Sequence, residues 1–305
     1  MTFDEARWRS NPEALRDALE SNRIVHFPTC PVPLPDQATL DFLRRELPSK
    51  LKLKNISYHP EAGKVSGIEA DEATTLRVTD LLRSHLNDIS SFLRRVTGDL
   101  TDGARIGTCS FRPIEEKGRN LKPHASNELV HVDAGAYGAT NGDRILRFFV
   151  NVNAERDRVW ATKGTFEEVL DRCGRMAGLL DESGRLAVSI TKGGADRAFS
   201  AVVAGLARLN PLATVLDSSP YDRAMRRLHN YMKDDEAFKR DLTGYQEIHF
   251  PPNTAWSVFT DGVSHASLEG QFALVTTMIV RRARMRWPER APFNTLLGRS
   301  TAMTA

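Results

Sequence analysis

The spacing of the apolar residues changes near Gly103, and this change constrains the fold more than any other feature of the sequence. Before it, residues 11–22, 36–47 and 71–98 carry apolar side chains at steps of three and four, which is typical of amphipathic helices. After it, short runs rich in β-branched and aromatic residues alternate with a period of two, which predicts strands. Helices followed by many short strands favour an α+β chain built on a double-sheet jelly roll.

Local signals support this order of elements. Asn11 and Asp36 are suited to cap the first two helices. Two further helices interrupt the strands: one opens with the capping box Thr165 and Glu168, and the other has Pro220 as its first helical residue. We therefore expect a single domain over residues 1–290, with a mainly helical part (1–103) and a jelly-roll core with helical insertions (104–285). Residues 291–305 are expected to form a poorly ordered tail.

The predicted strand at residues 145–153 has two different faces, because successive side chains of a strand point in opposite directions. One face is wholly apolar, so another element must cover it, and the N-terminal helices are the natural candidates: Leu146, Phe148, Val150 and Val152. The other face mixes polar and apolar groups, as the interior of a barrel that holds a polar ligand would: Ile145, Arg147, Phe149, Asn151 and Asn153.

His131 and Asp133 lie two positions apart in a predicted strand at residues 128–134, so both side chains point to the same face. A histidine, a carboxylate and a second, distant histidine form the ligand set of non-haem Fe(II) oxygenases. The pair alone is a weak signal, because the chain has eight histidines and many acidic residues. His265, between two predicted strands, is the best third ligand, and His249 is the second choice.

An iron site of this kind needs a reductant for O₂. If 2-oxoglutarate serves, its distal carboxylate needs a buried cation, and arginine suits this because its planar fork binds a carboxylate through two hydrogen bonds. Arg147 lies on the strand that follows the metal pair, and Arg112 lies on an earlier predicted strand. Arg281, on the strand that follows His265, is an alternative anchor.

Several strings of this sequence, in the same order, resemble the Kdo hydroxylases: "TCSFRPIEEKGR", "LVHVDAGAYGATNGDRILRFFVNVN", "RVW", "SPYDRAMRRLHNYMK" and "FPPNTAWSVFTDGVSHASLEGQFALVTTMIV". The resemblance covers roughly residues 105–280. These enzymes are Fe(II)/2-oxoglutarate-dependent dioxygenases that hydroxylate carbon 3 of 3-deoxy-D-manno-oct-2-ulosonic acid (Kdo) in the inner core of lipopolysaccharide.

The resemblance implies a double-stranded β-helix, with the N-terminal helices packed on its major sheet. It implies Fe(II) bound by His131, Asp133 and His265, and 2-oxoglutarate held by Arg112 and Arg147. The sequence departs from the family around the metal pair: the preceding stretch, "KPHASNEL", lacks a Trp and has Lys122 and His124 as its only basic groups, and the following loop is "GAYGAT". The substrate is therefore either a Kdo-bearing glycolipid or a small natural-product intermediate, and desaturation or ring formation stands beside hydroxylation.

Composition limits the other functions. No apolar run approaches the ~18 residues that a membrane span needs, and the N-terminus is too polar for a signal peptide, so we expect a cytoplasmic protein. Three widely spaced cysteines indicate neither a disulfide framework nor a zinc knuckle. A non-catalytic jelly-roll protein that binds a sugar or lipid headgroup is the alternative from another class.

The net charge of +3 is small for 305 residues, and the basic residues cluster densely only at residues 281–290. We expect no nucleic-acid binding there, because Trp287 is the only aromatic residue in the cluster. Peripheral contact with a membrane remains a prediction for four side chains: Arg281, Arg282, Arg284 and Arg286.

Overall fold

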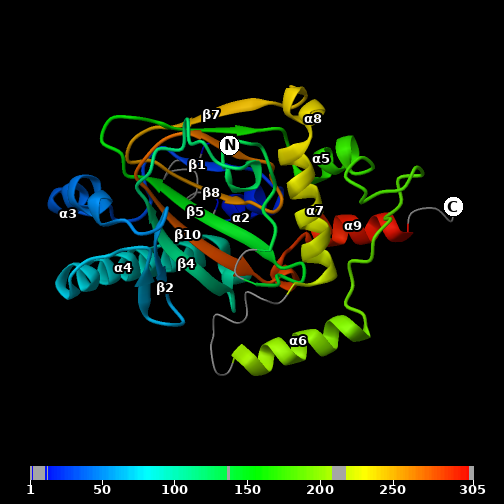
Figure 1. The fold of residues 1–305 in the computed structure, drawn as a ribbon, viewed down its shortest axis with the longest axis horizontal. Coiled ribbons are helices and arrows are strands. Elements are labelled where there is room, and N and C mark those ends of the chain that lie inside the picture. Colours follow the sequence, from blue (N-terminus) through cyan, green and yellow to red (C-terminus); the bar gives the residue numbers. More distant parts are fainter. Residues whose placement is uncertain (1, 3–10, 12, 136–137, 208–217, 302–305) are drawn as a thin grey trace.

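The computed structural model describes residues 2, 11, 13–135, 138–207 and 218–301. Its centre is an antiparallel sheet of seven strands, the major sheet (Figure 1). The strands, in spatial order, are β1 (Val25–Phe27), β8 (Ala255–Phe259), β5 (Arg144–Asn151), β10 (Ala273–Val280), β4 (Arg105–Arg112), β2 (Ile56–His59) and β3 (Lys64–Ser66). The predicted strand at residues 145–153 is therefore β5, and it lies between β8 and β10.

A second, minor sheet has three strands: β7 (Gln246–Phe250), β6 (Arg158–Thr162) and β9 (Ala266–Glu269). Aromatic side chains join the two sheets. Trp256 of the major sheet stacks on Phe250 of the minor sheet with 4.0 Å between the ring centroids, and on Phe149 at 4.9 Å. Two antiparallel sheets closed around such a core form a jelly roll, so the predicted α+β double-stranded β-helix is confirmed.

Helices cover the outer face of the major sheet (Figure 1). They are α2 (Glu13–Glu20), α3 (Gln37–Asp41) and α4 (Glu72–Thr97). Leu146, Phe148, Val150 and Val152 are buried in one cluster with side chains of these helices, and the rings of Phe148 and Phe92 of α4 meet edge to face at 5.9 Å. The prediction that N-terminal helices cover the apolar face of β5 is confirmed.

Side-chain caps fix the ends of several helices, as expected from the sequence. Asp36 accepts a hydrogen bond from the backbone N–H of Thr39, and Thr165 and Glu168 form the predicted capping box. The predicted helices that interrupt the strands are α5 (Phe166–Cys173) and α7 (Pro220–Asp234), which has Pro220 in its first turn, and the short α8 (Glu236–Arg240) follows α7. Among the described residues, no helix combines the length and the apolar character needed to cross a bilayer.

Some elements differ from the prediction. Residues 128–134 do not form a strand. Only His131 pairs with His265, in an isolated bridge, and the backbone N–H of Asp133 donates to the carbonyl of Thr260 rather than continuing this pairing. The strands β2 and β3 and the helix α6 (Gly194–Ala207) were not predicted. The short β2 and β3 carry polar residues that hide the alternating pattern.

The prediction of a poorly ordered tail is wrong for α9 (Pro292–Thr301). Leu296 of this helix is fully buried in a cluster with side chains of α5 and α7, and this packing orders the segment. Residues 302–305 lie outside the described residues. The division of the chain into one domain over residues 1–290 stays a prediction.

Candidate metal centre

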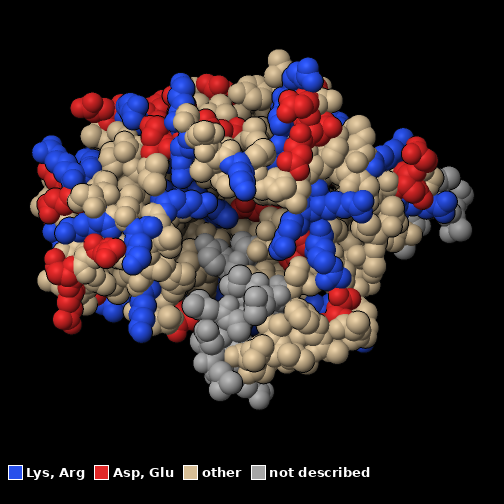
Figure 2. All heavy atoms as spheres, in the orientation of Figure 1, with Lys and Arg blue, Asp and Glu red and all other residues tan. Residues whose placement is uncertain are grey.

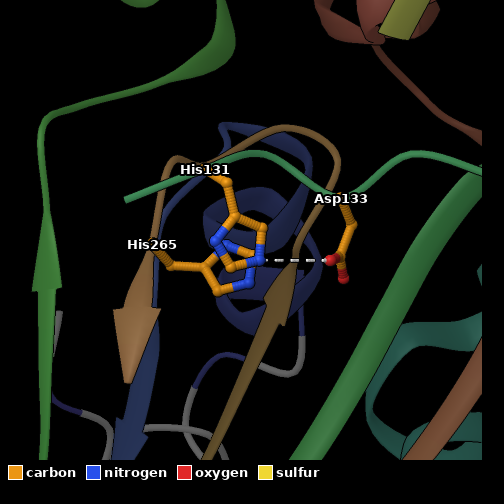
Figure 3. A group of neighbouring side chains, drawn as sticks. All are labelled: His131, Asp133 and His265. Atoms are coloured by element: carbon orange, nitrogen blue, oxygen red, sulfur yellow. Dashed lines mark ion pairs between the residues drawn. The ribbon is translucent and has the colours of Figure 1, made fainter. Parts of the chain in front are cut away.

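Three side chains that are distant in the sequence meet between the two sheets: His131, Asp133 and His265 (Figure 3). One nitrogen of each ring and one carboxylate oxygen all lie within 4.8 Å of one another. The backbone brings them together, because the N–H of each histidine donates to the carbonyl of the other, at 2.8 and 3.0 Å. In Figure 3 the two rings lie against each other, and the carboxylate of Asp133 faces Nε2 of His131 at 3.7 Å.

The backbone also sets the proton position on both imidazoles. Nδ1 of His131 is 2.7 Å from the carbonyl of Leu129, and Nδ1 of His265 is 3.0 Å from that of Val263. A carbonyl accepts only, so Nδ1 carries the proton and Nε2 keeps a lone pair, as in most metal-binding histidines. Burial lowers the pKa of both side chains, which stay neutral at pH 7.

Asp133 is ionised. Burial alone would raise its pKa, but the positive charge of the Arg147 guanidinium outweighs burial and holds the pKa of this carboxyl below its usual range. Nη2 of Arg147 lies 2.9 Å from Oδ2 of Asp133. The centre therefore presents two neutral imidazoles and one carboxylate, which is the ligand set that suits Fe(II) with positions left open for other ligands.

Two aromatic rings fix the histidines in place. Trp160 of β6 stacks on His265 with 5.1 Å between the centroids, and His229 of α7 meets His131 edge to face at 4.8 Å. Nδ1 of His229 is 2.8 Å from the carbonyl of Val132, between the two candidate ligands. Sequence reasoning did not identify His229, because a lone histidine within a predicted helix shows no sign of what its face of the helix contacts.

The candidate ligands line a cavity of about 240 Å³, below the ~300–1,000 Å³ of pockets for drug-sized molecules and therefore suited to a small one. Its lining residues are Lys54, Asn55, Arg112, Asn127, His131, Asp133, Arg147, Phe149, Trp160, His265 and Ser267. Arg112 and Arg147 extend into it from β4 and β5, on either side of β10. The guanidinium of Arg112 lies 5.9 Å from the centre of the Phe149 ring.

Several buried polar atoms of this lining have no hydrogen-bond partner among the described residues, and they include Nε of Arg147, Nε1 of Trp160 and Oγ of Ser267. Leaving such a buried group unsatisfied costs ~1–3 kcal/mol. All three groups can donate a hydrogen bond, so the cavity is suited to a ligand that accepts hydrogen bonds, such as a small carboxylate. A larger groove, of about 980 Å³, lies elsewhere beside α5, and none of the candidate ligands line it.

More cations surround the centre than the neighbouring sequence suggests. Lys54 lines the cavity, although it lies more than 70 positions before the metal pair. Lys233 of α7 is buried and donates to the carbonyl of Ser126, 2.9 Å away, and burial lowers its pKa to about 8. The expectation of few cations near the centre counted only residues adjacent in the sequence, and tertiary structure adds these two.

The second-choice residues lie elsewhere. His249 is exposed on β7, where its ring nitrogens face Asp157 and Glu247. Arg281 is exposed beyond the end of β10. Neither residue lines the cavity, whereas Arg112, His131, Asp133, Arg147 and His265 all do.

Comparisons with known proteins agree with this geometry. Residues 3–301 match the family described as 3-deoxy-D-manno-oct-2-ulosonic acid (Kdo) hydroxylase. No curated protein matches the chain. Among solved structures, the Kdo hydroxylase KdoO, a non-haem Fe(II) alphaketoglutarate-dependent dioxygenase, in complex with alphaketoglutarate and Fe(III) is 27% identical, with 98% of this chain and 94% of that chain covered and a TM-score of 0.79.

The same enzyme in complex with succinate and Fe(III) is 26% identical, with 100% and 98% of the two chains covered and a TM-score of 0.78. Its complex with cobalt(II) is also 26% identical at the same coverage, with a TM-score of 0.79.

Proposed function

Because this chain belongs to the Kdo hydroxylase family and is an Fe(II)/2-oxoglutarate-dependent dioxygenase, we propose that it hydroxylates a Kdo-bearing glycolipid at an unactivated C–H bond. The observation that carries this proposal is the convergence of His131, Asp133 and His265 within 4.8 Å, beside a cavity that also holds two arginines.

In this proposal His131, Asp133 and His265 bind the metal. The fit is chemical: both imidazoles are neutral with Nε2 unprotonated, and Asp133 is ionised. Bound Fe(II), together with 2-oxoglutarate and O₂, supplies the oxidant for the C–H bond. The protein's own part is to hold the ligands in one geometry and to keep water out of the cavity.

Arg112 and Arg147 bind 2-oxoglutarate in this proposal. Nε of Arg147 is buried and has no hydrogen-bond partner among the residues that the structure describes. It can therefore donate to a carboxylate oxygen of 2-oxoglutarate while Nη2 keeps its ion pair with Asp133. Arg147 therefore has two tasks, since it orients a metal ligand and contacts the co-substrate. Arg112 lies two strands away in the same cavity and contributes the second guanidinium.

The charge around the cavity favours an anionic substrate. Besides the two arginines assigned to 2-oxoglutarate, Lys54 lines it, and Lys233 donates to the carbonyl of Ser126 in the segment before the metal pair. A sugar acid such as Kdo carries the carboxylate that these cations would attract. This balance supports the glycolipid over a neutral natural-product intermediate.

The test is the reaction itself. With Fe(II), 2-oxoglutarate, O₂ and a Kdo-bearing lipid, we expect succinate to form in step with a substrate that gains one oxygen atom. His131→Ala should abolish both products, and His249→Ala is the matched control, because that exposed histidine lies outside the cavity. A rate of succinate formation that the glycolipid does not raise would exclude this substrate, and full activity of His131→Ala would exclude the assigned ligands.

Cytoplasmic location and contact of the basic cluster with a membrane remain predictions. Arg286 pairs with Glu13 and Asp17 of α2, and Arg284 lies 3.6 Å from Asp99. These acidic partners already neutralise part of the positive charge that the sequence places in the cluster.

A further inference from the structure

The helix α6 presents an apolar stripe to solvent. Phe199, Val202 and Leu206 follow one another at steps of three and four, so they lie on one face of the helix. Their side chains are 52%, 62% and 48% exposed. They are three of the ten large hydrophobic residues that are exposed in the described part of the chain, and they form a continuous patch rather than isolated side chains.

One flank of α6, next to the stripe, attaches the helix to the protein. Asp196 accepts a hydrogen bond from Arg223 of α7 at 2.9 Å, Ser200 accepts one from Lys192 at 2.6 Å, and Val203 is buried. On a helical projection these residues lie together on the side of the helix next to Phe199, and Val202 and Leu206 lie beyond Phe199 on the other side. The attachment therefore orients α6 with its apolar stripe outward, and Figure 1 shows the helix below α7 and apart from both sheets.

Positive charge accompanies the stripe. The first turns of α7 expose Arg226 and Arg227 as well as Arg223, which is paired with Asp196. The one acidic residue among the first ten residues of this helix, Asp222, is buried against Thr140. Figure 2 shows Lys and Arg side chains across the middle of this face, with α6 along its lower edge. An apolar stripe next to cations is the pattern of a helix that lies in the interface of an anionic membrane.

The size of the patch argues against a second copy of the chain as its partner. A helix of 14 residues is about 21 Å long and 10 Å wide, so it offers roughly 200 Å², whereas a stable protein interface needs about 800 Å² per partner. A bilayer needs no such area, because insertion of a few apolar side chains adds to the attraction of the headgroups for nearby cations.

We propose that α6 docks the protein on an anionic bilayer through Phe199, Val202 and Leu206, with the arginines of α7 facing the headgroups. The choice of a bilayer rests on the proposed function, because a lipid-linked substrate lies in one. Docking here uses the surface of α6 and α7, which is a different part of the chain from the arginine cluster of residues 281–290.

Sedimentation with vesicles tests this surface. The full chain should pellet with vesicles of phosphatidylcholine and phosphatidylglycerol but hardly with phosphatidylcholine alone, and added salt should weaken binding. A variant with Phe199→Ser, Val202→Ser and Leu206→Ser should lose roughly tenfold or more of the vesicle affinity. The matched control replaces three exposed apolar residues of other segments by serine: Leu76, Met176 and Leu242. It should bind like the wild type.

A second variant guards against misfolding of the first. Phe199→Trp should show a blue shift of fluorescence with anionic vesicles beyond any shift of the wild type. Equal pelleting of the triple variant and the wild type overturns the proposal, as does a stripe-dependent dimer without vesicle binding. Binding of Fe(II) and 2-oxoglutarate, measured without vesicles, should be the same in every variant as in the wild type. If the wild type binds neither, the proposed function is rejected, whereas vesicle binding through the stripe would still support the docking surface.

Discussion

At the scale of single residues, the centre depends on groups that do not contact the proposed metal. His229 packs against the His131 ring and bonds to the carbonyl of Val132, so it fixes the backbone and the ring between two candidate ligands. Such supporting contacts typically change metal affinity by ~10–100-fold when they are removed. His229 is a positioning residue in this account.

We therefore expect His229→Ala to weaken cobalt(II) binding by about tenfold or more, with little change in thermal stability. His229→Asn should recover part of the loss, since the side-chain amide can donate to the Val132 carbonyl as Nδ1 does. Cobalt titration followed by visible absorption measures both variants. Unchanged affinity of His229→Ala would show that His131 needs no support from α7.

Substitutions of Arg112 and Arg147 should both weaken 2-oxoglutarate binding but differ in their effect on metal binding. Lysine keeps the charge but loses the two-pronged hydrogen bond, so Arg112→Lys and Arg147→Lys should each raise the KM for 2-oxoglutarate by about tenfold or more. Arg147 also forms an ion pair with Asp133, so Arg147→Lys, unlike Arg112→Lys, should weaken metal binding as well. Parallel titrations with cobalt(II) and 2-oxoglutarate distinguish the two. A KM that neither substitution changes would remove both residues from the co-substrate site.

At the scale of elements, the alternating faces of β5 connect the helical layer to the site. The apolar face joins the core under α2 and α4, and the other face carries Arg147 and Phe149 into the cavity. This division was predictable, because a strand with one wholly apolar face must be covered. The isolated bridge of His131 was not predictable. The alternating apolar pattern of residues 128–134 is the same whether the whole segment pairs with a neighbouring strand or only His131 does.

The helix α4 carries a buried histidine that makes stability depend on pH. Burial lowers the pKa of His85 to about 4 from 6.5, and its Nε2 has no hydrogen-bond partner in the described part of the chain. The unfolded chain binds this proton near pH 6.5 and the folded chain does not, so the contribution of His85 to the free energy of unfolding is complete above pH 6.5 and decreases as the pH falls toward 4. The difference reaches roughly 3 kcal/mol.

His85→Leu removes this titrating group, so the free energy of unfolding of the variant should depend less on pH between 4 and 6.5. Urea unfolding at several pH values between 4 and 7 measures it, with His249→Leu as an exposed control that should change little. If both variants lose stability as steeply as the wild type when the pH is lowered from 7 to 4, groups other than His85 cause the acid sensitivity.

At the scale of the whole molecule, the sequence indicated the jelly roll, the helical cover and the residues that converge between the sheets. These follow from periodicity and from chemistry that needs particular residue types. Lys54, His229 and Lys233 could not be predicted, because each reaches the centre from a segment whose own pattern contains no information about the centre. The order of α9 was also hidden, since it comes from the burial of Leu296 against other helices.

The central claim is that two imidazoles and one carboxylate hold an iron ion that also binds 2-oxoglutarate. The most direct measurement is the visible absorption of the protein after anaerobic addition of Fe(II) and 2-oxoglutarate. The account predicts a weak charge-transfer band in the wild type and in His249→Ala, and its loss in His265→Ala. Absence of the band from the wild type, or its full retention in His265→Ala, would contradict the account.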